Sequence, residues 1–519
     1  MSERSERLFE ALSGIEEQKI DEAAPEDRTG RFRWRKWGVL AAALAVVIGA
    51  GSYVLPRLGG SSAGAGGAGV GSDGASTFMA YAGPVFPLTL KEADSTVTAE
   101  REITLDFEPW TPVWVPDEDF EAGGYYETST DIQVTDAYTL TNTSSEDKTV
   151  SVLYPFAGML LYLEKERPTL TAGGQELETI LHAGQYSGGF QGAWEGWPNR
   201  TDNPGTVNLD QPKSWEDYRD SLEDGDYLRS ALGKWADLSG VPVTVYEFTD
   251  PWGPEPDEKA GIPNPSIRVW FDLDYEKTEV LSYGFNGGSY DPENGHQGKS
   301  FSIPRDFWPE REKSPKYLIV LGEDIQNMTT QGYVTGGWDD DPTVEAGVTI
   351  KRYESTLEDI LRTAAGYALA EEEDFDLAYG LWKDWLLSYG VLADDPMERY
   401  RQGDIEPMDI NIMSRVFYLE AEVDIPAGGS VTLAAEMTKE GSYDFACVHT
   451  ENKGVYGYDM VTELGSNLTC TSQTAVLEDR GQIEIIRQNF GFDLANGVKK
   501  VALDPEAEHY YLEVKRIEK

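Results

Sequence analysis

The sequence predicts a mainly β protein with helical insertions (α+β), in which an N-terminal transmembrane helix is followed by a β-sandwich-type ectodomain of two or three packed units. Three observations lead to this fold class. An uncharged apolar run lies within residues 37–56, and alternating apolar and polar segments recur through residues 78–519, where helical spacing is confined to two stretches. About 440 residues follow the run, and a chain of that length usually forms more than one hydrophobic core.

Residues 37–56 are predicted to cross the cell membrane once. The 19 residues from Trp37 to Leu55 carry no charge, and a helix of that length is roughly 28 Å long, close to the thickness of a bilayer core. A cleaved signal peptide is the alternative, with Ser61, Ala63 and Ala65 as small residues for a peptidase, but the run begins later than in signal peptides. Basic residues before the run place the N-terminus in the cytoplasm and the rest outside. These topology-setting residues are Arg31, Arg33, Arg35 and Lys36.

Residues 1–36 form the predicted cytoplasmic tail. Four apolar side chains fall at helical spacing, and such a short helix is marginal alone but can dock in a groove of a partner. The partner-binding candidates are Leu8, Phe9, Leu12 and Ile15. An unstructured tail that only sets topology is the alternative.

Residues 57–77 are rich in Gly and Ser and predict a flexible linker. The net charge of the chain is −49, and nearly all of it falls outside the membrane. Such an acidic surface repels nucleic acid, so we exclude DNA and RNA as partners. Solubility explains the charge, and attraction of calcium or of basic peptides is the second interpretation.

Residues 78–350 read as an N-terminal β-rich ectodomain. Asp131–Asn142 and Lys148–Phe156 alternate and are joined by a polar turn, which predicts a β-hairpin. A second hairpin is predicted around Gly173 and Gly174, because tight turns need positive φ. Further strands are expected at 241–248, 266–275, 279–285 and 316–321.

Helices are predicted at 214–232, with a break at Gly225, and in an insertion at residues 351–396. In the insertion, Ser355 and Glu358 match a capping box, and a second helix is expected from about Phe375 to Val391. Residues 397–519 return to alternating segments on both sides of an IPAGG turn, and predict a C-terminal β-sandwich-like ectodomain.

The motif search predicts no cofactor, no metal site and no catalytic residue. No two histidines have metal-ligand spacing, and neither a nucleophile elbow nor a phosphate loop is complete. An acidic turn at 339–341 lacks the spacing of a calcium loop. Cys447 and Cys470, outside the membrane, are the disulfide candidates, and closing that loop stabilises by about 3 kcal/mol. Two buried thiols are the alternative.

Aromatic and glycine-rich segments give the best indication of binding. Residues 186–197 combine loop-type residues with rings that can stack on sugars or pack on peptides. The ligand-binding candidates are Tyr186, Phe190, Trp194 and Trp197. These rings could equally belong to the core, and the ligand would be an extracellular glycan or peptide.

Two resemblances extend this interpretation. The segments SERLFEALSGIEEQKIDEA and RWRKWGVLAAALAVVIGAG, with the spacer and outer domain, resemble single-pass membrane proteins of clostridial bacteria that act as anti-sigma-factor-like regulators of extracytoplasmic-function sigma factors. The tail has no Cys or His, unlike the zinc-binding anti-sigma type. FMAYAGPVFPLTL, YTLTNTSSEDKTVSVLYPF and GSNLTCTSQTAVLEDRGQIEIIRQNFGFDL resemble an uncharacterised family of the same bacteria. The first likeness implies that the tail binds a cytoplasmic sigma factor.

We therefore expect a single-pass, membrane-anchored extracytoplasmic protein that binds or senses a ligand without catalysis and signals through its tail. Two other function classes remain. A membrane-tethered glycan hydrolase would use paired carboxylates facing each other across a cleft. A purely structural surface protein would need no site at all.

Overall fold

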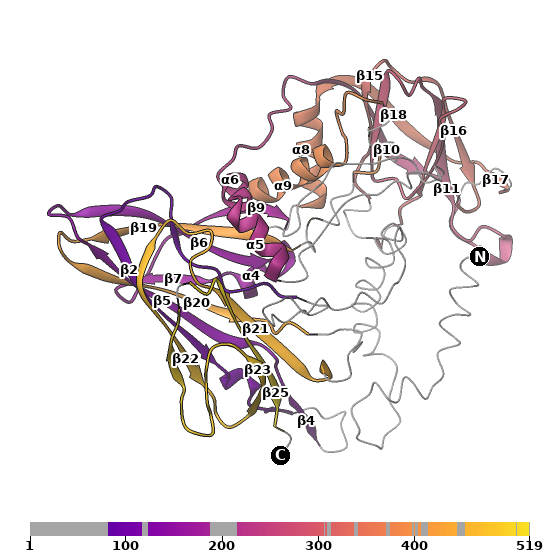
Figure 1. Cartoon of the computed structure of the whole chain (residues 1–519). Helices are drawn as coiled ribbons and strands as arrows, with labels where there is room; N and C mark the ends of the chain where they lie inside the picture. Colours follow the sequence, from indigo (N-terminus) through magenta and orange to yellow (C-terminus); the bar gives the residue numbers. More distant parts are fainter. Residues whose placement is uncertain are drawn as a thin grey trace. The chain divides into compact units, whose positions relative to one another are not determined.

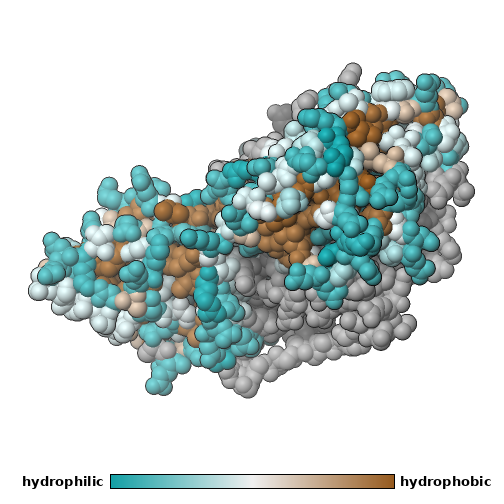
Figure 2. Space-filling view, turned by 90° about the horizontal axis from the view of Figure 1, so that it is seen from above, coloured by the Kyte–Doolittle hydropathy of each residue, from teal (hydrophilic) through white to brown (hydrophobic). Residues whose placement is uncertain are grey.

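The computed structural model describes thirteen stretches of the chain: 81–116, 123–186, 215–305, 307–308, 313–336, 341–369, 374–396, 399, 403–405, 410, 414–443, 452–504 and 506–517. The predicted tail, membrane span and linker lie outside them. Strands make up 49% and helices 15% of the structure, which confirms the mainly-β prediction. Among the described helices, none has the length and apolar character that crossing a bilayer requires. On the face that Figure 2 shows, hydrophilic residues surround several apolar patches.

A seven-stranded sheet joins strands from distant parts of the sequence, and several of them lie side by side in Figure 1. Only β2 and β22 run parallel; the other pairs are antiparallel. In spatial order the strands are β24 (Lys500–Ala502), β22 (Thr469–Glu478), β2 (Val97–Asp106), β5 (Ile132–Asn142), β20 (Ser430–Lys439), β7 (Thr169–Ala172) and β8 (Gln175–Glu176). The predicted β7–β8 turn is confirmed, with positive φ at Gly173 and Gly174.

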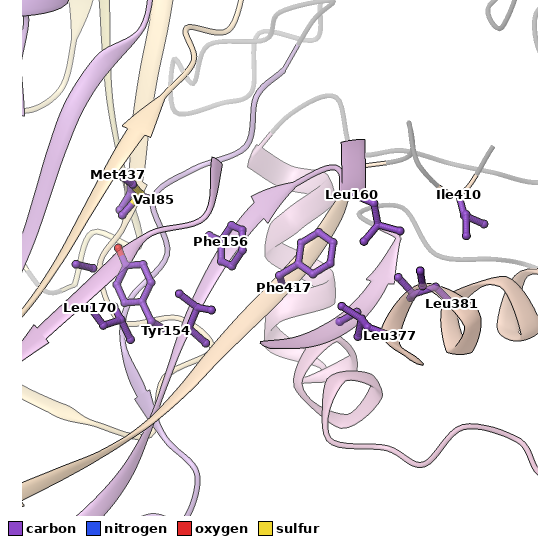
Figure 3. Close-up of a cluster of buried hydrophobic side chains, with 14 of the residues drawn as sticks. Val85, Tyr154, Phe156, Leu160, Leu170, Leu377, Leu381, Ile410, Phe417 and Met437 are labelled. Carbon is purple, nitrogen blue, oxygen red and sulfur yellow. The ribbon is translucent and has the colours of Figure 1, made fainter. Parts of the chain in front are cut away.

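Two further sheets share the core that the seven-stranded sheet buries. One contains β1 (Thr89–Leu90), β6 (Lys148–Gly158), β19 (Arg415–Ile425) and β9 (Ile180–Tyr186), and the other β21 (Val455–Val461), β25 (His509–Arg516) and β23 (Ile483–Gln488). Figure 3 shows this core at Phe156 and Phe417, whose rings stack at 5.5 Å. Helices α5 (Trp215–Glu223) and α6 (Asp226–Ala231) contact the opposite side of β6 and β19 through Trp215, Tyr218 and Tyr227.

The predicted hairpin of β5 with β6 is wrong, although both strands exist. β5 pairs with β2 and β20, whereas β6 pairs with β1 and β19 in another sheet. The turn at 143–147 therefore carries the chain from one layer to the other. The turn between β19 and β20 makes the reverse crossing next to it, and Gly428 donates its N–H to the carbonyl of Ser144 at 3.0 Å. An alternating pattern fixes which face of a strand is buried but not which strand is its neighbour.

Strand pairing does not follow the predicted boundary between residues 78–350 and 397–519. β19, β20 and β22 come from the C-terminal range and pair with β6, β5 and β2 from the N-terminal one. Both ranges therefore contribute to the same core.

Residues 81–90 form an N-terminal strap against this core. Val85 makes a parallel bridge to Met460, and β1 pairs with β6. The Tyr81 hydroxyl donates a hydrogen bond to the Asp459 carboxylate, and Leu88 N–H donates to the Tyr138 hydroxyl at 3.0 Å.

A buried ionic network holds the seven-stranded sheet to the elements that it faces. The Arg101 and Asp136 side chains are fully buried, and the guanidinium donates to both carboxylate oxygens at 2.7 and 2.8 Å. Tyr138 and Tyr154 donate to Asp136 at 2.9 and 3.1 Å. The third guanidinium nitrogen of Arg101, Nη1, donates to the carbonyl of Val461 at 2.6 Å. Every partner lies inside the protein, so this network is structural.

Residues 242–356 form two sheets that face each other across a second apolar cluster. The four-stranded sheet contains β12 (Thr278–Tyr283), β15 (Lys316–Gly322), β10 (Pro242–Trp252) and β18 (Gly347–Thr356). The five-stranded sheet contains β13 (Gly287–Asp291), β14 (His296–Ser302), β11 (Ser266–Asp272), β16 (Gln326–Tyr333) and β17 (Thr343–Val344). Phe248, Phe271 and Phe301 lie in the cluster between them.

Helices α8 (Leu357–Ala368) and α9 (Phe375–Ser388) belong to the core on the other side of the four-stranded sheet. The N-cap of α8 is Thr356, whose hydroxyl accepts a hydrogen bond from the Asp359 N–H. The predicted cap, Ser355, is wrong because β18 extends to Thr356 and Ser355 still belongs to that strand. The four-stranded sheet thus lies between helices and the five-stranded sheet, whose outer face points away from both cores.

Residues 113–127 form a separate unit with a short hairpin of β3 (Val113–Pro116) and β4 (Gly124–Glu127). Trp114 and Tyr126 meet edge to face across it, with ring centres 5.0 Å apart.

Candidate functional site on the five-stranded sheet

The residues that the sequence analysis selected are mostly outside the described part of the chain. These are the tail and topology-setting residues, Phe190, Trp194, Trp197 and Cys447. Tyr186 ends β9, where its backbone pairs with Arg415 of β19. Cys470 lies on β22 as a half-buried thiol, and burial raises the pKa of that thiol to about 11. Both the disulfide and the aromatic binding segment stay predictions.

The outer face of the five-stranded sheet gathers polar side chains around one aromatic ring. On β11 the side chains alternate, so that Ile267, Val269 and Phe271 enter the core between the sheets. Arg268, Trp270 and Asp272 therefore share the opposite face. Register places His296 of β14 beside Asp272, and Thr329 of β16 beside Trp270. Side chains from three strands thus gather around Trp270.

The half-buried ring of Trp270 is held between a cation and an imidazole. The Arg268 guanidinium lies over the ring with its carbon 3.9 Å from the centroid. The His296 ring stacks on Trp270 with centroids 4.9 Å apart and planes 9° from parallel. Arg268 precedes Trp270 by two residues and His296 pairs with the residue two positions after it, so they approach from opposite ends of the strand. We call this arrangement the Trp270 stack.

Gly298 gives the Trp270 ring its space on the sheet. Gly298 pairs directly with Trp270, and a Cβ atom there would lie 2.6 Å from two ring atoms. A side chain at this position would push the ring off the strand. The Trp270 stack therefore depends on a glycine 28 positions further along the chain.

Asp272 links the stack to hydrogen-bonding side chains. Its two carboxylate oxygens accept from His296 Nδ1 and from Asn327 Nδ2, each at 2.7 Å. These hydrogen bonds, chiefly the one from Asn327, hold the pKa of Asp272 below its ordinary value. Asn327 has φ +51°, and a bulge in the β11–β16 pairing between Trp270 and Asp272 brings it to this position. The Asp272 and His296 side chains remain 43% and 45% exposed, so solvent and ligands reach them.

The rest of the face adds hydrogen-bonding groups of both kinds. The Arg268 guanidinium donates to the Ser289 hydroxyl of β13 at 2.5 Å, and Thr329 and Gln331 of β16 are exposed. Hydroxyl and amide side chains both donate and accept. Across the described residues, no three His, Cys, Asp or Glu side chains converge as a metal site would need.

Two other features are weaker candidates. A shallow groove of about 790 Å³ follows edge strand β23 and is lined mainly by apolar residues such as Ile485, Ile486 and Phe492. Glu166, at the end of α4 (Leu163–Glu166), is a mostly buried carboxyl whose pKa burial raises to about 7. A raised pKa suits a general acid, and the charge of Glu440 adds to the shift, but neither carboxyl lines the β23 groove.

The sequence analysis missed Trp270 because it looked for aromatic rings in loops. A usable signal was present in SIRVWFD, where the alternating pattern predicts an outward side chain at the tryptophan. A large aromatic residue at a position that should face outward from a strand indicates either that the face is covered or that it binds a ligand. The partners His296, Gly298 and Asn327 follow only from the strand register.

Comparison with known proteins finds no match for this chain among family models, curated proteins or solved structures.

Proposed function

We propose that the protein is a membrane-anchored extracytoplasmic binding protein, and that it binds a neutral glycan without catalysis on the outer face of the five-stranded sheet. One observation carries the proposal. A half-exposed tryptophan lies beside an exposed carboxylate and an exposed amide on an open face, and Asp272 and Asn327 already have the spacing for a hydrogen-bonding pair.

The chemistry of the face favours a sugar over other ligands. A pyranose presents a face of C–H groups, which packs on an aromatic ring, and a rim of hydroxyls, which donate and accept. Asp272 can accept from such hydroxyls, while Asn327 and Thr329 can do both. The net charge of −49 disfavours an anionic polymer, so the ligand class is neutral.

The anchor and the cytoplasmic role remain proposals that rest on the sequence. The uncharged run at 37–56 and its basic flank support a single span with the N-terminus inside. The tail resemblance supports binding of a sigma factor through Leu8 and Leu12. A pull-down from cell extract should recover that partner with the wild-type tail and lose it with Leu8→Asp and Leu12→Asp.

Binding is tested with the full chain in lipid nanodiscs and a panel of neutral hexasaccharides built from glucose, mannose, xylose or N-acetylglucosamine. We expect at least one hexasaccharide to bind, and Trp270→Ala to lower its affinity at least tenfold. The control is Trp252→Ala, since Trp252 is 54% exposed on β10 of the other sheet and should not matter. Absence of binding by the whole panel, or equal binding by wild type and Trp270→Ala, would overturn the proposal.

A further inference from the structure

His296 occupies the place that a ligand of the proposed site needs. Its ring covers the Trp270 ring on one side, and its Nδ1 holds one oxygen of Asp272. A sugar stacked on Trp270 would need that ring surface and would use that oxygen. A single side chain therefore fills both the stacking position and the hydrogen-bonding position.

The molecule contains a second tryptophan–histidine–aspartate arrangement, which differs from the first in its exposure to solvent. His509 stacks on Trp215 with centroids 4.6 Å apart and bonds to Asp459 at 2.8 Å, so the chemistry is the same. The side chains of His509 and Asp459 are each only 8% exposed, whereas those of His296 and Asp272 are nearly half exposed. His509 has no space to move into, and His296 faces solvent.

The position of His296 at the start of β14 also allows movement. The residue follows a turn in which Gly295 has φ +65°, and Asp291 closes the turn through Asn294. A rotation of the His296 side chain toward solvent breaks one hydrogen bond and one stacking contact, without disturbing the apolar cluster behind the sheet.

We propose that His296 is a gate, a side chain that covers the binding surface of Trp270 and must swing away for the ligand to bind. The gate rests on the proposed function, because it names the residue that controls access to that site.

The test measures affinity for the hexasaccharide that binds wild type, with the full chain in nanodiscs. His296→Ala should bind at least threefold more tightly than wild type, because it uncovers the Trp270 ring and one oxygen of Asp272. His182→Ala, which removes a histidine–carboxylate pair with Glu420 on another sheet, should behave as wild type. Affinity of His296→Ala equal to or weaker than that of wild type would overturn the gate while leaving the binding function in place.

A readout without ligand separates the two proposals. In protein labelled with 5-fluorotryptophan, the resonance lost in Trp270→Phe belongs to Trp270. Its chemical shift should differ between wild type and His296→Ala, because only the wild type has an imidazole ring stacked on Trp270. Equal shifts would contradict the gate even if no hexasaccharide binds, and a difference in shift with no binding would contradict only the glycan proposal.

Discussion

Arg101 on β2 and Arg268 on β11 each lie over an aromatic ring with an aspartate on the same face of the sheet, but their surroundings differ. Arg101 is fully buried, and Asp136 accepts from it and from two tyrosines. Arg268 is also buried, yet Asp272 and His296 beside its ring remain nearly half exposed. Residue types alone therefore do not distinguish a structural network from a binding face. The two are distinguished by whether the aspartate and its partners are accessible to solvent.

The largest effect should come from breaking the buried ionic network of Arg101 and Asp136. Arg101→Met leaves Asp136 buried without its cation, and the free energy of unfolding should fall by about 3 to 5 kcal/mol. Urea unfolding of the full chain in detergent measures it. Arg101→Met combined with Asp136→Leu should recover part of the loss, because no buried charge then remains. A double variant no more stable than Arg101→Met would show that packing, rather than charge, dominates there.

Glu166 tests the opposite case, a buried carboxyl without a direct cation. It accepts from Met159 N–H at 2.8 Å, and burial raises its pKa from 4.5 to about 7. The folded state keeps a proton that the unfolded state loses, so this group lowers stability as the pH rises from about 4.5 through 7. Glu166→Gln should add up to about 3 kcal/mol at pH 8 and nothing at pH 4. Equal stabilisation at both pH values would contradict the raised pKa.

Arg268→Met is the direct counterpart of Arg101→Met. It removes a cation over Trp270 and a hydrogen bond to Ser289. We expect a loss of about 1 to 2 kcal/mol in urea unfolding. A loss as large as that of Arg101→Met would show that the Trp270 stack is structural, and the comparison would fail.

The smallest effect is expected at the rim of the binding face. Asn327→Gly keeps the positive φ and removes the amide next to Asp272. The dissociation constant for the hexasaccharide should rise about threefold, since one exposed hydrogen bond contributes roughly 0.5 to 1.5 kcal/mol. Calorimetric titration resolves such a change. Gln175→Gly, on β8 of the seven-stranded sheet, is the matched amide control and should leave affinity unchanged.

Much of the secondary structure followed from local pattern, because alternation and turn residues act over a few positions. The strands β5, β6 and β11 and the break at Gly225 were predictable for that reason. Strand partners were not. The pattern of β5 and β6 suggested a hairpin, yet each strand pairs with segments far away in the sequence.

The candidate site could not be predicted from local sequence patterns for the same reason, because it depends on which strands are neighbours. Asp272 and Asn327 are 55 residues apart and meet only through the register of β11 with β16 and its bulge. Gly298 shows its role only when Trp270 is placed opposite it. Alternation could have pointed to Trp270 itself, but not to the histidine that covers it.

The parallel pairing of β2 with β22 bears on how the protein is made. Ala99 accepts a hydrogen bond from Thr471, 372 positions later in the chain. At about 5 to 20 residues per second, a ribosome needs roughly 20 to 70 s to cover that distance. During this interval one edge of β2 lacks its native neighbour, and an open strand edge attracts other chains. Biogenesis of this protein should therefore depend on a chaperone that shields the nascent sheet until β22, in the last tenth of the polypeptide, arrives.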